Sequence, residues 1–415
     1  MTGEVESAPS SHGHRSWTDN RLLVALIFLA ALASSASQFS KGRFGAGFES
    51  VTLARNLAEH GQFASPFLFP TGPSAHLAPL FPAFLALVIW LAGYSPAFVL
   101  IVSGCAMLAH ALHAALMPAA SNLLFADRRP GICAGLLAVP PPVYSFIPGG
   151  EAIYCAAGLV LFCLYSDRWL RRGGAPGSLL AGVAMGLLAL LNPVSLLVAG
   201  PWLLYLLWRA VPRGRTRVCT LVAAGALVAL LPWTIRNYHQ FHAWFFVRDN
   251  LGIELYVSNN DAAQPTIDAN KAQDLQALHP TFSPTEAAAV RDLGEVRYNQ
   301  LRLRTALNWI GSHRTRFIAL SLARMRFFWF PDPAADAWHA WAVSSITAAS
   351  LLGLALLAIR RRPAAPFFAA VFAVYPLLYY FIQSDARYRT PILWLSLLLA
   401  GYLLMACWDA VAARR

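Results

Sequence analysis

Residues 41–79 read KGRFGAGFESVTLARNLAEHGQFASPFLFPTGPSAHLAP, a polar stretch rich in Gly and Pro that lies between two apolar runs. Only two carboxylates occur in it, Glu49 and Glu59. A polar loop held between membrane segments lies at the membrane surface, where polar side chains usually serve a function. We therefore expect the chemistry of the chain to be in this loop, with Glu49 as its acid/base.

The composition excludes an ordinary soluble domain. Hydrophobic residues make up 57% of the chain and charged residues 13%, against about a quarter charged in soluble domains. The apolar runs are continuous over roughly 17 to 22 residues, which favours spanning helices over alternating barrel strands. The net charge is +12, but the basic residues form short clusters between apolar runs, a pattern of membrane topology and not of nucleic-acid binding. The sequence predicts an all-α polytopic membrane protein.

Four basic clusters predict the orientation of the chain. By the positive-inside rule they are all cytoplasmic, so the alternate connections lie outside. The outer segments are then 41–79, 148–151, 192–193, 237–335 and 383–389. The four clusters are Arg168, Arg171 and Arg172; Arg209, Arg213, Arg215 and Arg217; Arg360, Arg361 and Arg362; and Arg414 and Arg415.

The number of spans depends on residues 79–125. A first span is expected at about 22–39 after a polar tail, and a cleaved signal peptide is the alternative to this retained anchor. The runs at 79–94 and 97–125 must together cross an odd number of times, because the chain passes from outside to the charged residues 127–129 inside. Either one run does not span, which gives about ten spans, or the second folds as a hairpin, which gives about twelve.

The segment 237–335 is the one sizeable part outside the membrane. Ser283-Pro284-Thr285-Glu286 has the pattern of a capping box, which predicts a helix from about 284 to 309, a break at Gly311 and an amphipathic helix from 313 to 329. The chain then divides into a cytoplasmic tail (1–20), a transmembrane module with the outer loop 41–79 (21–236), an extracytoplasmic segment (237–335) and C-terminal transmembrane helices (336–415).

The acidic residues favour an enzyme over an ion-coupled transporter. None of the 20 Asp and Glu residues lies in the middle of an apolar run, where coupled transporters usually carry a carboxylate. Glu49 and Arg55 do not share a helical face, which disfavours a structural ion pair. Glu151 follows Gly149-Gly150 and opens a helix, so capping of that helix is an alternative role. Further outer acids are Glu59, Asp249, Glu254 and Asp385.

Basic residues near the outer ends of the spans run against the positive-inside rule. A bound phosphate would explain them, because arginine presents a planar fork to phosphate oxygens. The alternative is that they reach toward lipid head groups. These residues are Lys41, Arg43, Arg55, Arg236, Arg248, Arg387 and Arg389.

Four short motifs occur in chain order: LARNL at 53–57, PLFP at 79–82, PWTIRNY at 232–238 and RYRTP at 387–391. Together they resemble motifs of the bacterial relatives of protein O-mannosyltransferases and aminoarabinose transferases, which are GT-C glycosyltransferases of the family 39/83-like group. The resemblance extends over nearly the whole chain. It implies a GT-C-like helical bundle in the bacterial inner membrane, with an active site on the extracytoplasmic side.

The resemblance also implies an activity, the inverting transfer of a sugar from a polyprenyl-phosphate donor to a lipid, glycan or protein acceptor. The family has an acid in each of its first two outer loops, and Glu49 and Glu151 match these positions. Glu49 would accept the proton of the attacking acceptor. The departing phosphate would be stabilised by arginines. The arginines expected to bind the donor phosphate are Arg236, Arg387, Arg389 and Arg55.

Some features depart from the family pattern. The first acid is usually Asp, often with a second acid close by, whereas Glu49 stands alone. The basic residue often found before the proline turn is replaced by His76-Leu77-Ala78. Some members use a divalent ion and others do not, so no cofactor is assigned. A flippase of lipid-linked oligosaccharides and a surface-polysaccharide polymerase or ligase are the alternative functions, and the latter would share the outer site.

Overall fold

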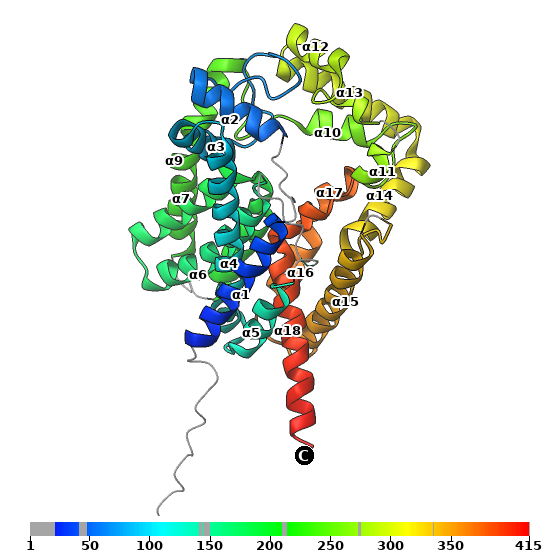
Figure 1. Cartoon of the computed structure of the whole chain (residues 1–415). Coiled ribbons are helices and arrows are strands. Elements are labelled where there is room, and N and C mark those ends of the chain that lie inside the picture. The colour runs from blue at the N-terminus through cyan, green and yellow to red at the C-terminus, as the bar shows by residue number, and fades with distance from the viewer. Residues whose placement is uncertain are drawn as a thin grey trace, which may run out of the picture.

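The computed structural model describes residues 21–40, 48–140, 143, 150–209, 214–272, 275–334 and 336–414. Within these ranges every extended regular element is a helix, as predicted (Figure 1). Six helices are long and apolar enough to cross a membrane. They are α1 (Arg21–Ser40), α4 (Pro96–Phe125), α6 (Ala152–Arg172), α9 (Arg215–Phe241), α15 (Ala337–Ile359) and α18 (Thr390–Ala412).

Shorter apolar helices complete the bundle. A break at Asn192-Pro193 separates two of them, as the sequence indicated, and the Asn192 side chain accepts a hydrogen bond from the Val194 amide there. The prediction of a helical membrane protein is confirmed, and the number of spans stays a prediction. The shorter helices are α3 (Leu80–Ala92), α5 (Arg129–Leu137), α7 (Ala175–Leu191), α8 (Leu196–Arg209), α16 (Ala365–Val374) and α17 (Leu377–Phe381).

The hairpin alternative for residues 97–125 is wrong. This run forms α4, one continuous helix of 30 residues that includes Pro118. By contrast α3 has 13 residues, about 20 Å of helix, which is shorter than the hydrocarbon core of about 30 Å. The geometry therefore agrees with the alternative in which one of the two runs does not span.

Helix α18 forms the centre of the bundle and is buried over most of its length. It packs against α5, α6 and α15. Inside a bilayer the hydrophobic effect does not drive helices together. Small residues are therefore important at helix contacts, because they allow two backbones to pack closely. Gly401 of α18 is such a residue, since a Cβ at this position would overlap the carbonyl of Pro130. Gly182 of α7 lies equally close to the carbonyl of Val222 in α9.

Between α9 and α15 the described residues form five α-helices at one end of the bundle (Figure 1). The predicted capping box forms only in part. Ser283 Oγ accepts a hydrogen bond from the Glu286 amide at 3.3 Å, but the Ser283 amide donates to the His279 carbonyl and the Glu286 carboxylate binds Arg302 instead. The predicted helix of residues 284–309 is wrong, because the chain turns at Gly294 with φ of 78°, and the second break falls at His313 instead of Gly311. The helices are α10 (Leu251–Ser258), α11 (Ile267–Lys271), α12 (Pro284–Leu293), α13 (Glu295–Ser312) and α14 (Arg314–Trp329).

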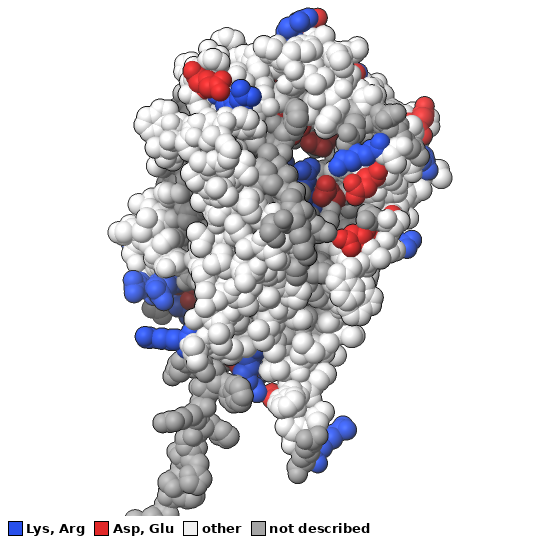
Figure 2. Space-filling model, in the orientation of Figure 1, with Lys and Arg blue, Asp and Glu red and all other residues white. Residues whose placement is uncertain are grey.

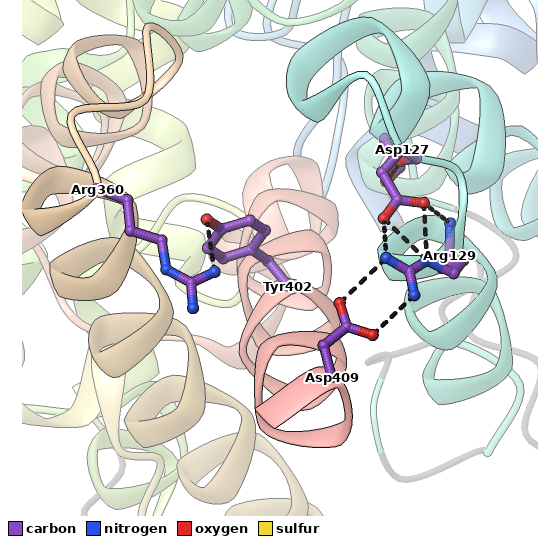
Figure 3. A network of polar contacts seen from close by, with 6 residues as sticks. Asp127, Arg129, Arg360, Tyr402 and Asp409 are labelled. Atoms are coloured by element: carbon purple, nitrogen blue, oxygen red, sulfur yellow. Dashed lines mark hydrogen bonds and ion pairs between the residues drawn. The ribbon is translucent and has the colours of Figure 1, made fainter. Parts of the chain in front are cut away.

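Polar contacts connect the C-terminal part of α18 to neighbouring segments on two sides. Figure 3 shows Arg129, which follows α4, bound to Asp409 near the end of α18, with Nη1 2.8 Å from Oδ1. Arg129 also contacts Asp127 at 2.9 Å. Arg360 approaches the Tyr402 hydroxyl at 3.5 Å from the other side of α18. Arg129 and Arg360 therefore lie near the C-terminal end of α18, and the membrane face on which this end lies stays a prediction.

The close contact of α7 and α9 can be tested by a matched pair of substitutions. We expect Gly182→Ala to destabilise the protein by roughly 1–3 kcal/mol, because the added methyl group meets backbone that cannot move aside. Gly104→Ala in α4 has open space around its Cβ and should be neutral or slightly stabilising. Thermal unfolding in detergent measures both. Equal midpoints for the two variants would contradict this packing.

Candidate active site

Glu49 lies in the first turn of α2 (Phe48–His60), a helix within the polar loop. The opposite face of α2 packs through Val51 and Ala54 onto α3. Oε1 of Glu49 accepts a hydrogen bond from Thr281 Oγ1 at 2.8 Å and lies 3.9 Å from Nδ1 of His279. The Glu49 side chain is 26% exposed, so the carboxylate is held in place and still open to a small molecule.

The surroundings keep Glu49 ionised. Burial raises the pKa of this carboxyl, but His279, His76, the Thr281 hydrogen bond and Arg387 together lower it, and the net shift is downward. A carboxyl with a lowered pKa carries a full negative charge at neutral pH. Glu49 is therefore in the form that can accept a proton.

His76 and His279 are the other two members of this cluster. His76 is 2% exposed, and burial lowers its pKa to about 3, so the ring is neutral at physiological pH. Its Nδ1 has no hydrogen-bond partner. Nδ1 of His279 accepts a hydrogen bond from the Thr281 amide at 3.2 Å and so carries no proton in this geometry. The two rings lie 5.8 Å apart between centroids.

Three contacts from distant segments fix the backbone just before His76. Arg236 of the PWTIRNY motif donates to the Ser74 carbonyl at 2.8 Å. The Ala75 amide donates to Glu295 Oε1 at 2.6 Å, and the Ala75 carbonyl accepts from the Asp249 amide at 3.0 Å. The outer loop is thus attached to α9, to α13 and to the segment between α9 and α10.

Glu151 lies at the start of α6, as predicted, but its side chain makes no capping hydrogen bond. Instead Asn192 Nδ2 donates to Oε1 of Glu151 at 3.2 Å. The charge of Glu151 acts on Arg387, and the charge of Arg387 acts on Glu49. The structure therefore brings the two predicted acids into the electrostatic range of one arginine.

Arg387 and Arg248 are the arginines nearest to this cluster. Arg387 has a side chain 48% exposed, with Nε 3.6 Å from Asp385. Arg248 acts electrostatically on His76 and has no ion pair or hydrogen bond within the described parts of the chain. Figure 2 shows charged side chains of both signs around a hollow in the half of the molecule that contains α10–α14. The visible flank of the bundle is nearly free of charged side chains.

The structure places the other predicted phosphate ligands differently. Arg236 also donates to the Phe63 carbonyl at 2.8 Å and lies over the Trp233 ring at 4.7 Å, so its donors are used by the protein. Arg389 is 3% exposed and donates to the Trp329 carbonyl at 2.9 Å and to Thr347 at 2.6 Å. Arg55 is on the surface, 3.5 Å from Glu59. The donors of Arg236 and Arg389 are thus directed at protein oxygens, which leaves them poorly suited to bind a phosphate directly. Their position in the motifs could not reveal these partners. The role of Arg55 stays a prediction.

Sequence reasoning missed His279 and Thr281, and it did not assign a role to His76 or Arg248. His76 stands where the resembled family often has a basic residue before its proline turn, and this difference could have indicated a functional role for His76. Nothing in the sequence pointed to His279, which lies 230 residues beyond Glu49 in the chain. Lys41 and Arg43 lie outside the described residues.

Comparisons with known proteins were made for the whole chain. No family model matches it. No curated protein matches it either. Among solved structures, ArnT from Cupriavidus metallidurans in the apo state aligns with 14% identity and a TM-score of 0.38, covering 92% of this chain and 76% of that one. The same protein bound to undecaprenyl phosphate aligns with 14% identity and a TM-score of 0.34, covering 92% and 77%.

ArnT is an aminoarabinose transferase and a GT-C glycosyltransferase, the class that the sequence motifs resemble. With identity and TM-scores this low, the likeness says nothing of activity. The chemistry of this chain has to follow from its own side chains.

The attachment of α13 to the outer loop predicts a pH dependence. Burial is the main cause that raises the pKa of Glu295 from 4.5 to about 8. Between these values the folded protein holds a proton that the unfolded chain has lost, so stability falls as pH rises from about 4.5 to about 8. We expect Glu295→Gln, which resembles the protonated form, to flatten this fall in the thermal midpoint. The exposed control Glu59→Gln should keep the wild-type profile, and a Glu295→Gln profile parallel to wild type would contradict the assignment.

Proposed function

We propose that the chain is a glycosyltransferase that moves a sugar from a polyprenyl-phosphate donor to an acceptor at the extracytoplasmic membrane surface. The observation that carries this proposal is the position of Glu49. Its carboxylate is ionised, partly exposed, and within the field of Arg387, which also faces Glu151. A general base beside cationic phosphate ligands is what direct displacement at an anomeric carbon requires.

The proposed reaction is a single displacement with inversion. The acceptor oxygen or nitrogen attacks the anomeric carbon and its proton passes to Glu49. The bond from that carbon to the phosphate oxygen breaks, and its electron pair leaves with the polyprenyl phosphate. Arg387 and Arg248 stabilise the charge that develops on this phosphate. Glu151, held by Asn192, is placed to orient the acceptor, which belongs to the lipid, glycan or protein class.

The remaining motif arginines have positioning roles in this proposal. Arg236 holds the backbone before His76, and Arg389 fixes the start of α18, two residues after Arg387. Arg387 itself is left with an exposed side chain. The phosphate is therefore bound by Arg248 and by Arg387, which is exposed and has a long ion pair with Asp385 at 3.6 Å.

The proposed orientation follows from the positive-inside rule. The network of Arg129, Arg360 and Asp409 lies near the C-terminal end of α18, whereas Arg387 lies before its N-terminal end. If the basic end faces the cytoplasm of a bacterial inner membrane, the site faces outward. A polyprenyl-phosphate sugar reaches such a site from the outer leaflet.

Replacement of Glu49 by Gln tests the base directly. We expect transfer from a labelled polyprenyl-phosphate sugar, measured with purified membranes, to fall by at least about 100-fold, because an amide cannot accept the proton. Glu59→Gln, on the exposed end of the same helix, should retain wild-type transfer. Unchanged transfer in the Glu49 variant would refute its role.

The role of Arg387 predicts a different kinetic effect. Arg387→Gln should lower kcat by roughly 10²- to 10³-fold, because charge stabilisation is lost on the leaving group. Arg291→Gln is the control, since Arg291 is exposed and contacts its neighbour Asp292 at 3.0 Å. Steady-state kinetics with varied donor concentration measure both. A change confined to the acceptor KM would place Arg387 away from the phosphate.

A further inference from the structure

The cluster around Glu49 has the composition of a metal site. Glu49, His76 and His279 each offer one ligand atom, and these atoms all lie within 4.8 Å of one another. Two imidazoles and one carboxylate form a common ligand set of catalytic zinc sites, in which the remaining position is open to water or substrate. Among the described residues this is the one group of His, Cys, Asp and Glu with such spacing.

The three ligands are held before any ion binds. Glu49 is fixed by the Thr281 hydroxyl, and the backbone before His76 is fixed by Arg236 and Glu295. His279 lies two residues from Thr281, whose amide donates to Nδ1 of the ring at 3.2 Å. A bound ion would take the place of this donor. Such support is typical of metal sites, where neighbouring hydrogen bonds orient the ligands.

The separations between the three ligand atoms are slightly larger than those in a zinc site, so small side-chain movements would bring the atoms to coordination distance. Two ligand atoms bound to zinc at about 2.1 Å are about 3.4 Å apart in a tetrahedron. The separation of 3.9 Å between Glu49 Oε1 and His279 Nδ1 and the outer limit of 4.8 Å for the set exceed this only slightly. Shifts on the order of 1 Å, within the reach of side-chain rotation, would complete the arrangement.

His76 provides an independent observation. Its ring is buried, and Nδ1 has no hydrogen-bond partner among the described residues, although buried polar atoms are nearly always paired. The neutral imidazole is the form that binds metal ions. A cation bound here would also balance the negative charge of Glu49.

We propose that Glu49, His76 and His279 bind one divalent transition-metal ion of the zinc class and leave one coordination position open to water or substrate. That the open position takes a phosphate oxygen of the donor rests on the proposed function. The binding of the ion does not, because the three protein ligands are sufficient for it.

The test is metal binding by the full chain, purified in detergent without a polyhistidine tag and stripped with a chelator. Titration with Zn²⁺ followed by calorimetry, and with Co²⁺ followed by visible absorption, should give one ion per chain. His279→Ala and His76→Gln should each weaken binding by at least about 10- to 100-fold. His60→Ala, at the exposed end of α2, should bind as wild type does.

Two results would overturn the proposal. One is a wild-type protein that takes up no ion at micromolar concentrations, and the other is unchanged binding in both folded ligand variants. Thermal unfolding without metal shows whether each variant is folded, and if His76→Gln is not, His279→Ala decides. Because neither donor nor acceptor is present, an inactive but metal-binding protein would refute the proposed function and leave this inference intact.

Discussion

The candidate site depends on how two peptide units of the outer loop are held. Ser74 and Ala75 have hydrogen bonds to Arg236, Asp249 and Glu295, three residues from three other parts of the chain. Each net bond contributes only about 1 kcal/mol to stability, but together they define where residue 76 must lie. An irregular segment without strands or a helix of its own thereby becomes as well positioned as a helical one.

A second constraint is the balance of charge around Glu49. Burial works against ionisation of this carboxyl, and one hydroxyl, two imidazoles and Arg387 overcome that effect. The same arrangement leaves His76 neutral. The site thus combines a full negative charge on Glu49 with nearby imidazole nitrogens, a combination suited both to accepting a proton and to binding a cation.

The sequence predicted well what depends on local pattern. Long apolar helices form where the apolar runs are long, Ser283 caps α12, and Glu151 directly precedes α6. It predicted poorly what depends on long-range partners. The motif arginines look alike in sequence, yet Arg389 is enclosed by Trp329, Thr347 and Ser396 while Arg387 is half exposed. His279 became visible only when folding brought its segment beside α2.

The pair Arg387 and Arg389 has a mechanical consequence. The 3-10 helix Ala386–Arg389 contains both residues and leads directly into α18. The buried Arg389 fixes the backbone of this turn, and the exposed Arg387 extends from it. The long side chain of Arg387 therefore begins at a fixed backbone position, which limits the positions that its guanidinium can reach. Part of the conformational entropy of Arg387 is therefore lost already on folding, and this part does not weaken the binding of an anion.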